Sequence, residues 1–349
     1  MDPESLEEKM DNGENPSMDD DDYYDYNNYS PSGFCNKEEV QIFGALVTSV
    51  FFSAVIIFSL VGNILVLVIL VKYENLKSLT NAFILNLAVS DLMFTLGLPF
   101  WAAYELHTWI FGEPVCKAVS FIFDTSFYSS IIFLTVMTIH RYMAVVHPLS
   151  VVTSRTTCYC PVISVAAWLT SLLSAAPALL KTTSKNDNDN SMHCEYNSTR
   201  WKMVGAYQQN AFFLVSFTII AFCYVQILVR LLRPTSHTKN KTVKLILCIV
   251  IVFFMGWGPY NMALFLKTLT DLSVEPFTDC GVSTRVDYAF YICRLIAFSH
   301  CCLNPLFYVF VGVKFRNHLK KLLWYYWRAI EGQRRNSQIV SNGEDISMY

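Results

Sequence analysis

Seven long apolar segments restrict what this chain of 349 residues can fold into. The segments cover residues 42–71, 79–104, 115–146, 157–180, 203–230, 243–267 and 286–312. A helix that crosses a bilayer needs about 20 mostly apolar residues, and each segment supplies them. A spanning barrel would instead show shorter segments of alternating hydrophobicity. The sequence therefore predicts an all-α membrane protein whose main domain, residues 42–313, is a bundle of seven transmembrane helices.

The composition excludes several other classes of protein. Only 15% of the residues are charged, against roughly a quarter in soluble domains. The net charge of −2 and the short basic runs argue against nucleic acid as a partner. The sequence contains no HExxH, GxSxG or phosphate-binding glycine loop, so we expect no enzyme. His300, Cys301 and Cys302 are consecutive on one predicted helix and point in different directions, so we expect no shared metal site.

Basic residues in short loops set the orientation of membrane helices. One set of segments between the spans consists of residues 72–78, 147–156, 231–242 and the tail after 313. With Arg230 and Lys244 at its edges, this set holds 15 Lys/Arg and 4 acids. The opposite set holds 7 Lys/Arg and 9 acids: residues 105–117, 181–202 and 267–287. We therefore predict that the first set is cytosolic, that the N-terminus lies outside the cell and that the protein is a multi-pass protein of the plasma membrane.

The N-terminal segment, residues 1–41, is acidic and polar. Its first 39 residues carry a net charge of −11, whereas the rest of the chain carries +9. Such a segment cannot bury enough apolar surface to fold alone, so we expect it to be disordered. It either serves as a solvated tail or captures a basic protein, because charge speeds encounter and aromatic rings add contact area. Three tyrosines stand among the aspartates: Tyr23, Tyr24 and Tyr26. Two glycosylation sequons lie on the predicted outer side, at Asn28 and Asn197.

The segment after the seventh span, residues 314–328, mixes basic and apolar residues at helical spacing. This pattern is typical of an amphipathic helix on the inner membrane face, although a frayed extension of the seventh helix would give a similar pattern. Four aromatic residues could anchor it at the interface: Trp324, Tyr325, Tyr326 and Trp327. Residues 329–349 read as a disordered cytoplasmic tail.

Four cysteines fall in the predicted outer segments, an oxidising compartment: Cys35, Cys116, Cys194 and Cys280. Four cysteines permit three pairings. We favour Cys116–Cys194, which would hold a loop over the bundle mouth, together with Cys35–Cys280, which would tie the N-terminal segment to the third outer loop. The remaining cysteines lie within or at the edge of spans and are expected to be reduced.

Polar residues at membrane depth are costly and usually face a polar interior. Asp91 lies midway along the second span, and three polar residues of other spans could join it: Asn63, Ser130 and Asn304. This set forms either a hydrogen-bond network or an oxygen site for a small cation such as sodium. Asp124 and Arg294 lie at similar depth in the third and seventh spans, so they either pair or contact a ligand. Prolines predict kinks in four spans, at Pro99, Pro177, Pro259 and Pro305.

An ordered set of motifs over about residues 35–325 resembles the rhodopsin-like family of G-protein-coupled receptors. The motifs are Gly62-Asn63, Leu87-Ala88-Val89-Ser90-Asp91-Leu92, Cys116, Arg141-Tyr142, Trp168, Tyr224, Trp257-Gly258-Pro259 and Asn304-Pro305-Leu306-Phe307-Tyr308. Within that family the chain resembles chemokine receptors, on Leu98-Pro99-Phe100-Trp101, the Cys35/Cys280 pair and the run Ala297–Pro305. The chain resembles the XC-type (lymphotactin) group of these receptors more narrowly, in the segments Thr138–Tyr142, Trp257–Asn261 and Val311–Arg316.

The resemblance implies a receptor that binds a small basic chemokine, of the XC type, and activates a heterotrimeric G protein, of the Gi class. The N-terminal tail would capture the folded ligand. The ligand's flexible N-terminus would enter a pocket formed by Trp101, Asp124, Tyr260 and Arg294. Trp257, Pro259 and Pro305 would act as the switch. Coupling to the G protein would fall to Arg141, Tyr142, Tyr224 and Tyr308, and arrestin would be a further partner.

Three positions depart from the family pattern. His140 replaces the usual acid before Arg141, so the usual ionic restraint on that arginine is missing. Arg294 stands where many chemokine receptors carry a glutamate, so Asp124 would have to receive a ligand amine. Ser216 stands about where the fifth span usually has a proline. The alternatives are a chemokine-scavenging receptor that couples weakly to G proteins and a receptor for a non-chemokine peptide; the lack of an internal repeat argues against a transporter.

Overall fold

The computed structural model describes residues 38–76, 78–147, 156–185, 192–231, 241–277, 279–311, 315–328 and 331. All of these residues belong to one unit, Glu38–Tyr349. The predicted N-terminal segment therefore lies almost wholly outside the described residues. Its boundary at residue 41 falls inside the first helix, which already begins at Glu38.

Seven long apolar segments are helical, which confirms the predicted seven-helix transmembrane bundle. The helices are α1 (Glu38–Tyr73), α2 (Leu79–Leu106), α3 (Gly112–Val146), α5 (Thr156–Ala175) with the 3₁₀ turn η2 (Ala176–Leu180), α6 (Thr199–Leu231), α7 (Lys241–Asp271), and the pair α8 (Cys280–Phe298) and α9 (His300–Val311). A helix satisfies all its backbone groups within one segment, which is what a lipid environment demands.

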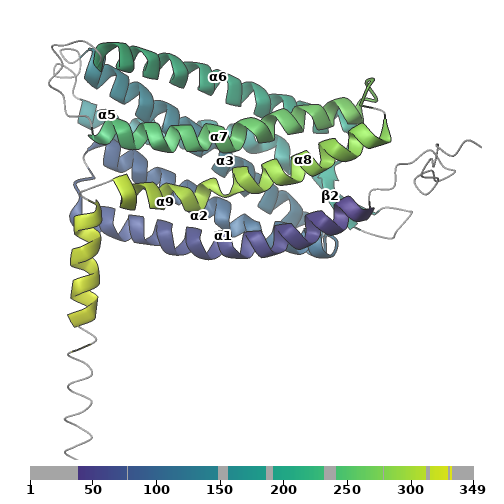
Figure 1. Ribbon diagram of the computed structural model, residues 1–349, viewed down its shortest axis with the longest axis horizontal. Helices are drawn as coiled ribbons and strands as arrows, with labels where there is room; N and C mark the ends of the chain where they lie inside the picture. Colours follow the sequence, from purple (N-terminus) through teal and green to yellow (C-terminus); the bar gives the residue numbers. More distant parts are fainter. Residues whose placement is uncertain are drawn as a thin grey trace, which may run out of the picture. The chain divides into compact units, whose positions relative to one another are not determined.

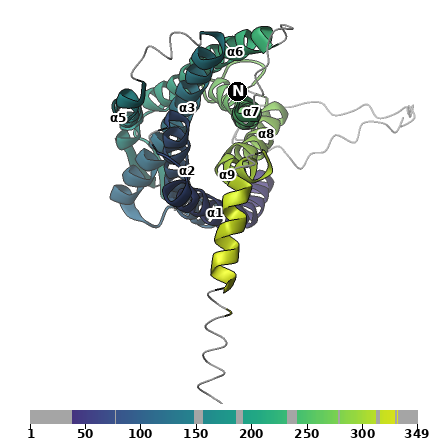
Figure 2. The ribbon, with the colours of Figure 1, turned by 90° about the vertical axis from the view of Figure 1, so that its left-hand side faces the viewer.

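The helices form a closed ring, which Figure 2 shows from one end of the bundle. Contacts run from α1 to α2 and α3, on through α6 and α7, and back through α8 and α9 to α1, while α5 packs outside against α3. Large side chains fill the ring, and Phe52, Phe94, Phe133, Phe253 and Trp257 are almost completely buried. The outward faces carry exposed aliphatic residues, as expected for surfaces that meet lipid.

A two-stranded antiparallel sheet lies at one end of the bundle and adds a β element that the sequence did not predict. Strands β1 (Lys181–Lys185) and β2 (Met192–Tyr196) pair with Thr183 opposite Cys194. Cys194 forms the predicted disulfide with Cys116 of α3. Figure 1 shows β2 at the end where α1 and α8 begin; this end is called the hairpin end below. Cys280 is also disulfide-bonded, and its predicted partner Cys35 lies outside the described residues.

The seventh span differs from the prediction at its start and in its middle. It begins at Cys280 rather than 286, because Asp279 caps it by accepting a hydrogen bond from the Val282 backbone N–H at 3.0 Å. It breaks at Ser299 between α8 and α9, whereas α9 continues through Pro305. The Ser299 carbonyl accepts from the N–H groups of Cys302 and Leu303, so the break keeps its backbone hydrogen bonds.

Residues 315–328 form the predicted helix after the seventh span. His318 stacks on Tyr73 and lies 3.2 Å from Glu74, so the helix starts beside the end of α1. Leu322 is buried, whereas the four aromatic residues Trp324, Tyr325, Tyr326 and Trp327 are exposed. Contact of these rings with the membrane face stays a prediction.

Close packing of α1 against α9 at Gly62 yields a stability prediction. A Cβ at Gly62 would stand 2.8 Å from Pro305 Cβ, so one helix would have to shift. Gly62→Ala should lower the stability of the purified receptor by about 1–3 kcal/mol, the usual cost of overpacking. Thermal unfolding in detergent measures this change.

Gly256→Ala is the matched control, because a Cβ there would meet its nearest neighbour, the Ile296 carbonyl oxygen, at an ordinary contact distance of 3.4 Å, while the gain in helix propensity is the same. Equal melting temperatures for the two variants would contradict this account of the α1–α9 contact.

Candidate functional site

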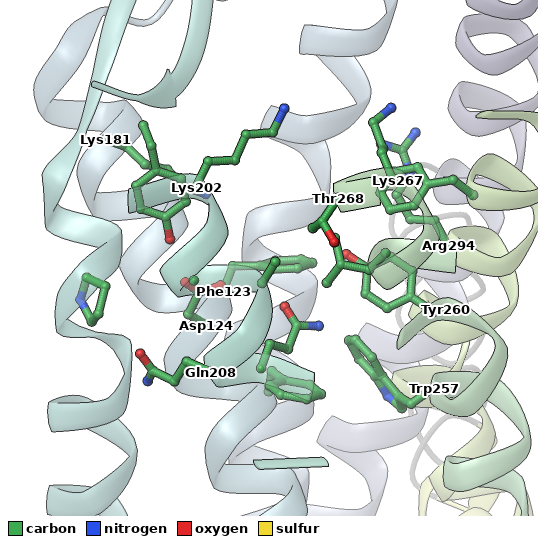
Figure 3. A pocket seen from close by; sticks show the side chains of 18 of the residues that line it. Phe123, Asp124, Lys181, Lys202, Gln208, Trp257, Tyr260, Lys267, Thr268 and Arg294 are labelled. Atoms are coloured by element: carbon green, nitrogen blue, oxygen red, sulfur yellow. The ribbon is translucent and has the colours of Figure 1, made fainter. Parts of the chain in front are cut away.

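A cavity of about 240 Å³ opens within the ring at the hairpin end. Its walls come from α2, α3, α6, α7 and α8, with Phe52 of α1, Ser174 of α5, Pro177 of η2 and the two strands of the hairpin. Figure 3 shows the side chains that point into it. The four residues predicted to bind a ligand all line it: Trp101, Asp124, Tyr260 and Arg294. Trp257, predicted as a switch, lines the same cavity.

Charged side chains of both signs face the cavity. Four bases line it, Lys181, Lys202, Lys267 and Arg294, against two acids, Asp124 and Asp271. Figure 3 shows Lys181 and Lys202 on one side and Lys267 and Arg294 on the other. The three lysines were not predicted, because residues at the ends of spans look like ordinary loop charges in a sequence.

Arg294 forms an ion pair with Glu105 of α2, not with Asp124. Its Nη1 lies 2.6 Å from Glu105 Oε1, and only 14% of the Arg294 side chain and 13% of the Glu105 side chain are exposed. Tyr291 lies under the guanidinium at 4.8 Å from its ring centroid. The pair joins α2 to α8, so part of Arg294's charge is already neutralised by the protein. Glu105 was missed because it stands at the very end of its span.

Asp124 is partly buried and has no ion pair among the described residues. The charged group of Lys181 and the phenols of Tyr128, Tyr196 and Tyr260 lie near enough to interact with it electrostatically. Burial raises the pKa of Tyr196, and the Asp124 carboxylate raises it further, so that this phenol stays protonated at physiological pH. Asp124 is therefore the lining acid best placed to receive a cation from a ligand.

Trp257 connects the cavity to the polar interior of the bundle. Its ring stands 4.5 Å from the ring of Phe127 and 5.2 Å from that of His300. His300 Nε2 in turn lies 3.7 Å from Asp91 Oδ1. A movement of Trp257 thus has a short path through packed side chains to Asp91.

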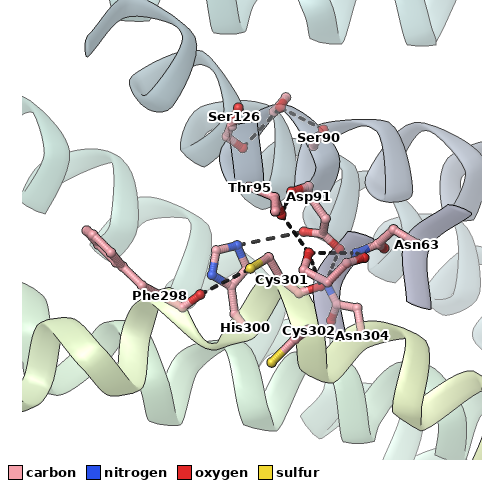
Figure 4. A network of polar contacts seen from close by, with 12 residues as sticks. Asn63, Ser90, Asp91, Thr95, Ser126, Phe298, His300, Cys301, Cys302 and Asn304 are labelled. Atoms are coloured by element: carbon pink, nitrogen blue, oxygen red, sulfur yellow. Dashed lines mark hydrogen bonds and ion pairs between the residues drawn. The ribbon is translucent and has the colours of Figure 1, made fainter. Parts of the chain in front are cut away.

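Asp91 lies in a buried polar network that joins α1, α2 and α9 (Figure 4). Asn304 Nδ2 donates to Asp91 Oδ2 at 2.8 Å, and Thr95 Oγ1 donates to the Asp91 carbonyl at 2.6 Å. Thr95 also meets the Ser59 hydroxyl at 2.6 Å. Asn63 reaches this group by donating to Ser59 and to the Cys301 carbonyl, so it joins the network without touching Asp91.

The residue types at this network fit a sodium ion. Two buried oxygens of the network, Asp91 Oδ1 and Asn63 Oδ1, have no hydrogen-bond partner among the described residues. Ser130 Oγ of α3 is likewise buried and without such a partner, but no hydrogen bond of the described residues joins it to this network. Small hard cations take oxygen ligands of these kinds. His300 Nε2, on the other hand, stands close to the free Asp91 oxygen. Sodium binding stays a prediction.

The end opposite the hairpin holds the residues predicted to couple to a G protein. Arg141 Nη2 donates to Thr80 Oγ1 of α2 at 2.5 Å, and the described residues provide no acid within ion-pair distance of it. Tyr224 is buried close to Arg141. The Tyr142 hydroxyl oxygen lies 3.2 Å from His147 Nε2. The side chain of Tyr308 falls outside the described residues.

Several other predicted positions also lie outside the described residues, namely Tyr23, Tyr24, Tyr26 and Asn28. Asn197 is described and exposed, directly after β2, where a glycan would meet solvent. Glycosylation at both asparagines stays a prediction.

Comparisons with known proteins match this architecture. Residues 62–308 fit the model of the 7 transmembrane receptor (rhodopsin family). The chain is 47% identical to Chemokine XC receptor 1 of Homo sapiens, over 83% of this chain and 85% of that protein. It is 45% identical to the Mus musculus protein of the same name, over 87% and 91%, and 39% identical to C-C chemokine receptor type 4 of Homo sapiens, over 82% and 81%.

The chain therefore belongs to the rhodopsin family of seven-transmembrane receptors and, within it, to the chemokine receptors. It is accordingly a multi-pass protein of the plasma membrane.

The Glu105–Arg294 pair yields a test of its structural role. Replacing one partner of a buried ion pair leaves the other charge unpaired, so Glu105→Ala should destabilise the receptor by about 3 kcal/mol. The double variant with Arg294→Ala should lose less than the two single variants added together. Thermal unfolding of the detergent-solubilised chain measures all three.

Glu113→Ala is the control, because Glu113 and Lys117 form an exposed pair on α3, with 43% and 36% of the side chains exposed. Its loss should cost under about 1 kcal/mol. If Glu105→Ala behaved like Glu113→Ala, the proposed α2–α8 link would contribute nothing to stability.

Proposed function

We propose that this protein is a cell-surface receptor that binds a chemokine of the XC type at the hairpin end and activates a heterotrimeric G protein of the Gi class at the opposite end. Membership of the chemokine receptors supports the kind of ligand, and the relatives named Chemokine XC receptor 1 support the XC type. The hairpin end is extracellular in this proposal, in agreement with the distribution of basic residues between the loops.

The ligand's flexible N-terminus enters the cavity, and its amine meets Asp124. Asp124 is the acid that faces the cavity without an ion pair among the described residues, whereas Arg294 is engaged by Glu105. Trp101 and Tyr260 supply the aromatic walls. The acidic tail with Tyr23, Tyr24 and Tyr26 captures the folded, basic part of the ligand, and its charge speeds encounter.

One observation carries the signalling part of the proposal: Trp257 lines the ligand cavity and also packs on His300, which stands beside Asp91. An agonist that binds one arrangement of these side chains more tightly than another shifts the population of bundles toward the arrangement that it prefers. The break at Ser299, next to His300, and the prolines Pro259 and Pro305 are where the helices would bend. The G protein then binds at Arg141, Tyr142, Tyr224 and Tyr308, and arrestin is a further partner. The helix of residues 315–328 lies on the inner membrane face.

A panel of chemokines that includes the XC type tests this function on cells expressing the full chain. The XC-type ligand should inhibit cAMP formation and recruit arrestin, and Asp124→Asn should reduce its potency about tenfold through the lost charge pairing. Arrestin recruitment without any G-protein response would favour the scavenging receptor. A response to other peptides only would remove the chemokine from the proposal.

Basal activity should depend on the hydrogen bond between Arg141 and Thr80. His140 gives Arg141 no acidic neighbour, so Thr80 supplies the restraint that an acid provides in many relatives. Removal of a hydrogen bond to a charged group costs about 1.5–3 kcal/mol, so Thr80→Val should raise ligand-independent G-protein activity roughly tenfold. Nucleotide exchange on Gi in isolated membranes measures it.

Thr80→Ser keeps the hydroxyl and is the matched control, which should behave as the unmodified receptor. Basal exchange that is the same in Thr80→Val and Thr80→Ser would show that this hydrogen bond does not restrain Arg141.

A further inference from the structure

Lys181 differs from the other bases of the cavity in its partners. Among the described residues, Lys202 pairs with Asp271 at 2.8 Å, Lys267 with Asp287 at 2.9 Å and Arg294 with Glu105 at 2.6 Å. Lys181 has no ion pair within this described set, although Asp124 lies near enough to interact over a longer distance. Its ammonium group faces the cavity, and none of the acids in the described part of the chain lies within ion-pair distance of it.

The ammonium group of Lys181 stands between two aromatic rings. Its Nζ lies 5.6 Å from the ring centroid of Trp101 and 5.2 Å from that of Tyr196. Contacts of this kind with an aromatic ring stabilise a cation by about 0.5–2 kcal/mol. They do not use the N–H groups of the ammonium in hydrogen bonds to an oxygen or a nitrogen. The rings hold the group in place and leave its donors available to an acceptor inside the cavity.

The backbone around Lys181 is fixed by the hairpin. Lys181 is the direct cross-strand partner of Tyr196, and two residues before Tyr196 the disulfide ties β2 to α3. A preorganised charge of this kind binds an opposite charge without first losing the freedom of a loop.

We propose that Lys181 binds the carboxylate of an acidic side chain in the ligand segment that enters the cavity, while Asp124 receives the amine at the start of that segment. This inference rests on the proposed function and names the chemistry of the ligand. The cavity recognises a segment with both a cation and an anion, not an amine alone.

The charges that line the cavity are the reason for expecting an acid in the ligand segment. Three of the four lining bases are paired with acids, which leaves Lys181 and Asp124 as the lining charges without an ion pair among the described residues. For a ligand with only a positive end, repulsion by Lys181 would oppose the attraction of Asp124. An acid in the same segment converts that repulsion into attraction. Complementary charges of this kind determine which partner binds more than they determine raw affinity.

The probe is the chemokine that activates the receptor in the panel described above, with each Asp and Glu of its flexible N-terminal segment changed in turn to Asn or Gln. One amide variant should lose about tenfold in potency on the unmodified receptor. Lys181→Gln should lose the same factor with the unmodified ligand and should show no further loss with that amide variant. Lys181→Arg should restore most of the potency.

Lys117→Gln is the control, because Lys117 is a base of α3 that pairs with Glu113 and does not line the cavity. Staining of surface receptor separates poor expression from poor binding, and the amide ligands on the unmodified receptor test the inference even if Lys181→Gln does not reach the surface. An activating chemokine without an acid in that segment, or additive losses in the combined experiment, would overturn the inference. A panel without any activating chemokine would instead overturn the proposed function.

Discussion

The disulfide between Cys116 and Cys194 is the constraint on which the ligand cavity depends. It attaches β2 to the start of α3, and the register of the hairpin then fixes Tyr196 opposite Lys181. Both of these residues line the cavity, and Trp101 of α2 completes the aromatic group around Lys181. Without this bond the hairpin would lose its covalent attachment to α3, and the wall that it gives the cavity would be held less firmly. The covalent link therefore converts a flexible connection into part of a binding site.

A buried polar network lies between the ligand cavity and the opposite end of the bundle. Trp257 separates the cavity from His300, and beyond His300 the hydrogen bonds of Asp91, Asn304 and Asn63 join three helices. Buried polar groups are costly when they are unsatisfied, so a rearrangement must exchange one set of hydrogen bonds for another. This favours a few discrete arrangements over a continuous range. The break at Ser299 stands next to His300, where such an exchange needs the helix to change direction.

The spans could be predicted because hydropathy marks the helices, and the disulfide from Cys116 because four cysteines fall in the predicted outer segments. Asp124 and Arg294 could be predicted because charges at membrane depth are rare enough to be informative, whereas Trp101 and Tyr260 followed only from the resemblance to chemokine receptors. The break at Ser299 could not be predicted, since proline is the visible signal for a bend and Pro305 is accommodated within α9. The start at Cys280 was hidden by charged residues such as Asp287, which pairs with Lys267 across two helices. Arg294 pairs with Glu105 because the folded bundle brings these two long side chains of α2 and α8 together, which the sequence does not display.

Three ion pairs around the cavity each join two different helices. Lys202 and Asp271 link α6 to α7, Lys267 and Asp287 link α7 to α8, and Glu105 and Arg294 link α2 to α8. In the proposed function, a charged ligand that enters the cavity would compete with the acid or the base of each pair. The free energy of that competition would act on the spacing of the helices, because a weakened pair holds its two helices together less strongly. Binding and helix movement would thus be coupled by the same charges, and the Lys202–Asp271 pair, whose side chains are the most exposed of the three pairs, would be the first to weaken.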